Sequence, residues 1–308
     1  YKGDLKVEVG SSVEKGETYA DALRSHQKIF DNLYSNMVEA GEVGGILDTI
    51  LKRLAAYMEK AMALKGKVKS AMVYPAAIVS IAVIVIVFLM IFVIPTFATM
   101  FEGAGAALPL PTQIVMSASF YTKRYIVHTI VLAVVVGFLF KRFYATEKGK
   151  LVVDNIILKV PVFGSLIQKV AVAKFTRTMG TLIASGVPIL QGLDVTARTA
   201  GNKVIEKAVL SVIDDVQKGQ NIAETLEKKK VFPTMVVQMI GVGEAAGALD
   251  SMLNKIADFY DEEVDTAVEG LTSLLEPALM AFLGVVVGFI VVAMYLPIFK
   301  LATLAGGG

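Results

Sequence analysis

The chain of 308 residues contains no cysteine, no tryptophan and only two histidines. The absence of cysteine excludes disulfide frameworks, thiolate zinc sites and cysteine nucleophiles. His26 and His128 lie too far apart in the sequence to indicate a pair of metal ligands. The 30 basic and 28 acidic residues leave a net charge of +2, which gives no overall attraction to nucleic acid. We therefore expect no metal, no cofactor and no nucleic-acid partner.

Apolar residues, in contrast, make up 55% of the chain, and they include three long apolar runs. A hydrocarbon core of about 30 Å is crossed by about 20 helical residues. We therefore expect transmembrane helices at residues 72–94, 125–140 and 276–299. The second run is short, and the alternative interpretation of it is a buried core helix. Basic residues bracket both of its ends and can reach the two membrane interfaces, which favours a span.

Basic residues near the spans predict the orientation. Four precede the first span and four follow the second: Lys60, Lys65, Lys67, Lys69, Lys141, Arg142, Lys148 and Lys150. These flanks should be cytoplasmic, although Lys123 and Arg124 count against that placement. The expected organisation has cytoplasmic regions at 1–71 and 141–275, a short turn-rich extracytoplasmic connector at 95–124 with the segment "LPLP", and an extracytoplasmic tail at 300–308.

The two cytoplasmic regions resemble copies of each other. "AGEVGGILD" at 40–48 aligns with "VGEAAGALD" at 242–250 at an offset of 202 residues, which also pairs Pro75 with Pro277 and Pro95 with Pro297. Upstream of a single-residue indel the offset becomes 203. The repeat therefore includes a helical domain and the membrane span that follows it.

Apolar residues in each copy follow helical spacing, as at Leu47, Ile50, Leu51 and Leu54, and strand alternation is nowhere sustained. The predicted fold class is an all-α membrane protein with two duplicated cytoplasmic helical-bundle domains and three transmembrane helices. The second copy extends upstream at least to Lys174, whose counterpart would precede residue 1. We expect that the natural protein has an N-terminal part that this chain lacks.

The repeated motif places a glutamate among glycines at a helix-to-helix corner. Glycines there permit positive φ angles, and a carboxylate just before the next helix can accept its unpaired N–H groups. A catalytic acid would need a partner, and no histidine, cysteine or second carboxylate recurs beside it in both copies. We interpret the motif as a structural corner made by Gly41, Glu42, Gly45, Gly243, Glu244 and Gly247.

The segment Gly241 to Ala246 also matches the dinucleotide fingerprint GxGxxA, but it lacks the βαβ context that this fingerprint requires. No GxxxxGK[ST] phosphate loop occurs, so the chain is not itself a P-loop ATPase. We expect no catalytic residues.

Four segments together resemble a known family: the duplicated "GExxGxLD" corner, "GVPILQGLDVTARTAGN", "ADFYDEEVDTAVEGLTSLLEP" and "MYLPIFKLA". They are similar to the type II secretion F family, the inner-membrane platform proteins of bacterial type IV pilus and type II secretion machines. The ending is more like the pilus branch. The resemblance implies a non-enzymatic, multi-pass protein of the bacterial inner membrane. Its implied partners are a hexameric assembly ATPase, pilin subunits, other inner-membrane pilus alignment proteins, membrane lipid and further copies of itself.

Equivalent positions ahead of the first and third spans carry opposite charges. Lys60 corresponds to Glu262 and Lys67 to Glu269, and each pair is seven residues apart, hence on one helix face. One interpretation is that both charged helix faces are simply exposed to solvent. The other is that the faces pair, within one chain or between protomers, or that the acidic face receives a basic partner.

Two further features concern the third span. Gly284 and Gly288 form a small-xxx-small pattern that allows close helix approach, either within the chain or in an oligomer. Glu276 lies at the membrane boundary, where it reaches the cytoplasmic interface or lines a groove for a pilin helix. A type II secretion platform, a secondary transporter and a scaffold unrelated to pili remain as alternative functions.

Overall fold

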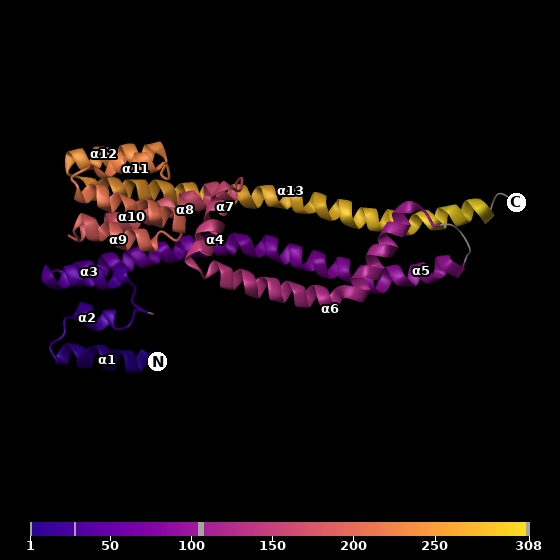
Figure 1. Cartoon of the computed structure of the whole chain (residues 1–308), viewed down its shortest axis with the longest axis horizontal. Helices are drawn as coiled ribbons and strands as arrows, with labels where there is room; N and C mark the ends of the chain where they lie inside the picture. The colour runs from indigo at the N-terminus through magenta and orange to yellow at the C-terminus, as the bar shows by residue number, and fades with distance from the viewer. Residues whose placement is uncertain (1, 28, 104–107, 306–308) are drawn as a thin grey trace. The chain divides into compact units, whose positions relative to one another are not determined.

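The computed structural model describes residues 2–27, 29–103 and 108–305, and this part of the chain is helical without strands. Figure 1 shows the helices in chain order. Their bounds are α1 (Lys2–Glu14), α2 (Tyr19–Arg24), α3 (Asn32–Val43), α4 (Leu47–Phe88), the π-helical turn η1 (Leu89–Val93), α5 (Ile94–Gly103), α6 (Leu110–Tyr144), α7 (Glu147–Lys159), α8 (Phe163–Ala184), α9 (Ile189–Thr199), α10 (Lys203–Gln217), α11 (Ile222–Lys229), α12 (Thr234–Ala246) and α13 (Leu249–Ala305).

The chain divides into two compact units. The first, the domain unit, comprises residues 1–67 and 147–268, and the second, the span unit, comprises 68–146 and 269–308. Two helices belong to both units, because α4 and α13 continue without a break from one into the other. At a rise of 1.5 Å per residue, these helices are about 63 Å and about 85 Å long.

The repeat expected from the sequence is visible in the helix bounds. α2 and α11 begin at Tyr19 and Ile222, 203 residues apart, whereas α4 and α13 begin at Leu47 and Leu249, 202 residues apart. α3 and α12 are likewise equivalent. The predicted all-α fold with duplicated domains is confirmed.

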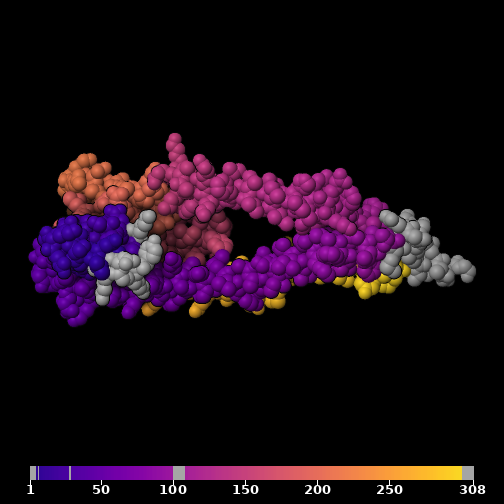
Figure 2. Space-filling model, turned by 90° about the horizontal axis from the view of Figure 1, so that it is seen from below, coloured from indigo at the N-terminus to yellow at the C-terminus, as the bar shows by residue number. Residues whose placement is uncertain are grey.

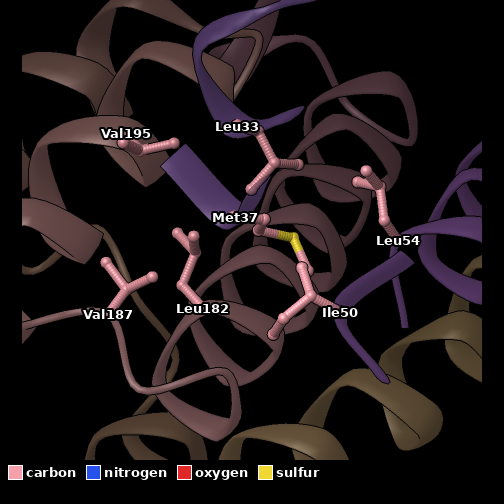
Figure 3. Close-up of a cluster of buried hydrophobic side chains, with 7 residues drawn as sticks. All are labelled: Leu33, Met37, Ile50, Leu54, Leu182, Val187 and Val195. Atoms are coloured by element: carbon pink, nitrogen blue, oxygen red, sulfur yellow. The ribbon is translucent and has the colours of Figure 1, made fainter. Parts of the chain in front are cut away.

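The two copies share one apolar core in the domain unit. Leu33 and Met37 of α3, with Ile50 and Leu54 of α4, pack against Leu182, Val187 and Val195 from the second copy (Figure 3). Met37, Ile50 and Leu182 are completely buried. Truncating a buried leucine or isoleucine of this kind to alanine typically costs about 2–5 kcal/mol. The sequence-based boundaries separated 1–71 from 141–275, but this core joins them in one unit.

Three helical stretches in the described part of the chain are long and apolar enough to cross a membrane: 47–99, 110–144 and 249–299. Only 6%, 0% and 11% of their most apolar segments are buried within the protein, so these side chains face outward. The space-filling view shows an opening between the α6 side chains, in magenta, and the α4 side chains, in purple (Figure 2). The apolar half of α6 is therefore not covered by the described part of the chain.

The prediction of a turn-rich connector at 95–124 was wrong. α5 covers 94–103 and α6 begins at Leu110, so this region is mostly helical. The prolines of "LPLP" account for the difference, because Pro109 is the N-cap of α6 and Pro111 lies in its first turn. Proline is tolerated there, since first-turn N–H groups have no partner within the helix. The expected tail at 300–308 is also helical as far as Ala305.

Candidate functional site: glutamate corners, charged helices and proline carbonyls

Glu42 and Glu244 lie in the last turns of α3 and α12, and each binds the start of another helix. The two Glu42 carboxylate oxygens accept hydrogen bonds from the backbone N–H groups of Tyr19 at 2.8 Å and Ala20 at 3.2 Å. In the second copy, Glu244 accepts from Ile222 at 2.9 Å and Ala223 at 3.2 Å. The glutamate thus closes the N-terminus of a short helix more than 20 residues upstream.

This arrangement differs from the expected one, in which the carboxylate served the helix that follows it. The following helix instead carries its own acid in the first turn, Asp48 in α4 and Asp250 in α13. The Asn221 side chain, at the N-cap of α11, makes no capping hydrogen bond, so Glu244 supplies that acceptor from a distance. The negative charge also lies at the positive end of the helix dipole.

The glycines around each glutamate have two separate roles. A Cβ on Gly41 would lie 2.8 Å from Cγ1 of Ile50, and one on Gly243 would lie 3.0 Å from Cβ of Met252. These positions therefore allow α3 and α12 to pack closely on the helix that follows. Gly45 and Gly247 both have φ of +66°, the left-handed conformation that ends a helix and favours glycine.

Both carboxylate oxygens of each glutamate accept hydrogen bonds from backbone N–H groups. In the described part of the chain, no three histidine, aspartate or glutamate side chains are grouped as metal ligands would be. The motif is built as a tertiary helix cap.

The basic face of α4 pairs with an acidic face of α13 within one chain. Lys60 Nζ lies 2.9 Å from Asp258, and Lys67 forms an ion pair with Asp265. Both pairs join residues 198 apart, one helical turn short of the repeat offset. Consequently Asp258 and Asp265, rather than Glu262 and Glu269, receive the two lysines.

Arg177 of α8 adds a third helix to this contact. Its guanidinium donates to Asp258 at 2.7 Å and Asp261 at 2.6 Å, while its side chain is only 11% exposed. Asp258 is therefore shared by Lys60 and Arg177. The sequence does not reveal the role of Arg177, because a single arginine within a helical segment carries no signal of its partners. Exposed ion pairs contribute about 0–1 kcal/mol each. The partly buried pair between Arg177 and Asp258 should therefore contribute the most among the ion pairs that join α4, α8 and α13.

Other sequence-predicted residues lie at the surface. Glu262, Glu269 and Glu276 are exposed and form no ion pair among the described residues. Gly284 and Gly288 are exposed too, and a Cβ at either would meet no atom within 4 Å. Within the described chain they bring no helices together, so a close contact at these glycines would require another protein.

In the span unit, α6 satisfies two carbonyls near the repeated prolines. Pro297 has no N–H, so the carbonyl of Ala293 lacks its helical donor, and the Thr112 hydroxyl donates to it. In the first copy, Ile94 N–H bonds back to Leu89 across the π-turn before Pro95, and Ser119 donates to the neighbouring Met90 carbonyl. Thr112 and Ser119 are buried and lie seven residues apart on one face of α6.

Taken together, duplicated helical domains, matching glutamate caps and two long helices that continue into apolar spans define a polytopic membrane protein built from an internal repeat. A sequence model described as "Type II secretion system (T2SS), protein F" matches residues 8–95 and 175–297. The chain belongs to this family.

Individual relatives agree with the family match. The chain is 54% identical over 296 residues to the type IV pilus assembly protein PilC of Myxococcus xanthus, covering 96% of this chain and 70% of the relative. It is 43% identical to PilC of Pseudomonas aeruginosa, covering 98% and 81%. The type II secretion system protein F of Xanthomonas campestris is 35% identical, with 97% and 74% covered.

Proposed function

We propose that this protein is the inner-membrane platform of a type IV pilus assembly machine. In this role it couples a cytoplasmic hexameric assembly ATPase to the movement of pilin subunits. The observation that carries the proposal is the continuity of α4 and α13, each of which begins in the domain unit and continues into a span. A force applied to the domain unit then reaches the membrane through helices without an intervening loop.

The pilus is favoured over secretion by the relatives. The PilC proteins named above are 54% and 43% identical to this chain, against 35% for the secretion protein F. A secretion platform is therefore the second candidate. We do not propose a transporter or an unrelated scaffold, since these relatives are named for pilus assembly and secretion.

The proposed orientation has the domain unit in the cytoplasm, beside the ATPase. It rests on the basic residues that precede the first span and follow the second. The chain contributes no chemistry of its own in this proposal. Its other proposed partners are inner-membrane pilus alignment proteins, and its exposed apolar span surfaces favour self-association or contact with lipid.

The experiment is affinity co-purification of the full chain, in detergent or nanodiscs, with the assembly ATPases of its source organism. We expect one ATPase to be retained by the folded chain. A variant carrying Lys60→Glu and Lys67→Glu shows whether retention requires the pairing of α4 with α13 or only the surface of the domain unit. Failure of the monodisperse, folded chain to retain any assembly ATPase would contradict the proposed coupling.

A further inference from the structure

A groove opens between α5 and the first half of α6 in the span unit. Its volume is about 480 Å³, and its apolar wall is formed by Ile94, Pro95, Ala98, Met116 and Phe120. Lys123 and Arg124 line the same groove. Apolar walls together with cationic side chains make this cavity amphipathic.

The groove follows from the spacing of residues on the two helices. Met116, Phe120 and Lys123 recur at intervals of four and three residues, so they form one face of α6. Opposite them, α5 presents Pro95 and the small side chain of Ala98. The small side chain of Ala98 on α5, opposite the larger side chains of α6, leaves room for the groove.

The cations in the groove have no acidic partner among the side chains that the structure describes. Neither Lys123 nor Arg124 forms an ion pair among the described residues, although the Arg124 guanidinium lies 5.9 Å from the ring centre of Tyr125. Glu102 is the only acidic residue between positions 94 and 140 of the sequence. Lys123 and Arg124 are both exposed, so an external anion can approach them and would be attracted to both charges at once.

The location of these cations matches the headgroup level of a bilayer. They immediately precede the apolar run 125–140, whose segment is wholly unburied within the protein. Tyr121 and Tyr125 are exposed beside them, with stacked rings 6.2 Å apart. Tyrosines gather at membrane interfaces, where one end of the ring is apolar and the other is wet.

We propose that this groove binds one anionic phospholipid. The phosphate contacts Lys123 and Arg124, and the glycerol backbone with the first part of one acyl chain contacts the apolar wall before the chain enters the bilayer. A basic residue near an anionic headgroup contributes about 1 kcal/mol, so removing both charges should weaken binding about 30-fold. The proposal is independent of the pilus function.

The test is native mass spectrometry of the full chain titrated with phosphatidylglycerol or, in parallel, phosphatidylcholine. Lys123→Gln combined with Arg124→Gln should weaken phosphatidylglycerol binding about 30-fold and leave the weaker phosphatidylcholine binding unchanged. The matched control is Lys141→Gln with Arg142→Gln. It removes the same charges at the other end of the same apolar run, outside the groove, and should change binding less than 3-fold, on the order of RT.

A second variant tests the apolar wall. Ala98→Leu fills the groove and should weaken binding of phosphatidylglycerol while leaving both cations in place. Equal losses in the groove and control charge variants, or undiminished binding in Ala98→Leu, would overturn the proposal. So would displacement of the lipid by equimolar inorganic phosphate, which would identify a free-phosphate site.

A photo-crosslinking residue at Phe120 distinguishes lipid from protein in cells. We expect lipid adducts at this position. A protein adduct in their place would identify the groove as a helix-docking surface and contradict the lipid proposal.

Discussion

Replacing Glu244 with alanine removes the tertiary cap of α11. The change leaves the N–H groups of Ile222 and Ala223 without acceptors, and Ile222 is only 4% exposed. Hydrogen bonds to a charged group contribute about 1.5–3 kcal/mol, and loss of an N-cap costs about 1 kcal/mol. The lost hydrogen bonds and the lost N-cap are the same interaction, so their costs are not added. We expect Glu244→Ala to lower the free energy of unfolding by about 2 kcal/mol. The same change at Glu42, which is exposed, should cost about 1 kcal/mol because water replaces it more readily.

Amide hydrogen exchange in detergent measures this cost locally. A loss of about 2 kcal/mol should speed exchange at residues 222 and 223 about 30-fold, if opening of α11 limits their exchange. Glu244→Gln should give an intermediate effect. The glutamine oxygen can still accept from one of the two N–H groups, whereas its NH2 group would face the other N–H group and cannot accept from it. Glu262→Ala is the control, since that exposed side chain caps no helix. Unchanged exchange at both amides in a folded Glu244→Ala protein would refute the capping argument.

Three further predictions concern charges and hydroxyls. Reversing Lys67 to glutamate should lower the unfolding temperature, and reversing Asp265 to lysine in the same chain should restore part of it, whereas Asp258 is left unchanged because Arg177 also needs it. Thr112→Val should destabilise the span unit by about 0.6–1.7 kcal/mol, measured by denaturant unfolding in mixed micelles, because the Ala293 carbonyl loses its donor. Burial, with a smaller contribution from Lys65, lowers the pKa of Lys174 below its ordinary value of 10.5. Lys174→Met should therefore raise the unfolding temperature at neutral pH. This gain over the wild type should disappear as the pH approaches 10.5.

The sign of the Lys174 effect follows from proton binding. Between the lowered pKa of the folded state and the ordinary value, the unfolded chain binds more protons, so the wild type gains stability as the pH rises. A difference in unfolding temperature that stays constant across this window would contradict the assignment. For the charge reversal, Glu269→Lys is the control, and rescue by that substitution would show that the register is wrong. For Thr112, Thr112→Ser keeps the hydroxyl and should behave like wild type.

The membrane spans and the internal repeat were predictable because both can be recognised from the order of residues alone. A run of apolar residues and a helical period are properties of consecutive residues. The equivalence of Pro95 with Pro297 also needs only a comparison of the chain with itself. For these features, no knowledge of tertiary contacts was necessary.

The partners of individual side chains were less predictable, because they depend on packing. Glu244 was expected to serve the next helix, but α12 packs against α11 at Gly241, where an added Cβ would lie 3.3 Å from Cβ of Ala223, and Glu244 accepts hydrogen bonds from α11 instead. The lysines of α4 were expected opposite Glu262 and Glu269. A shift of one turn between the paired helices gives them Asp258 and Asp265.

The helical connector was missed because proline was interpreted only as a turn residue. Pro109 and Pro111 begin α6, where proline is accepted. Thr112 and Ser119 were overlooked for a related reason. Their importance depends on carbonyls left unpaired near prolines far away in the sequence.

The most direct test of the proposed coupling is ATP turnover by the assembly ATPase, titrated with the full chain in nanodiscs. We expect turnover to change to a plateau with the wild-type chain. The Lys67→Glu chain should still bind the ATPase but give a smaller change, and added Asp265→Lys should restore it. Turnover that is unaffected by saturating, folded wild-type chain would contradict the account of this protein as a motor-coupled platform.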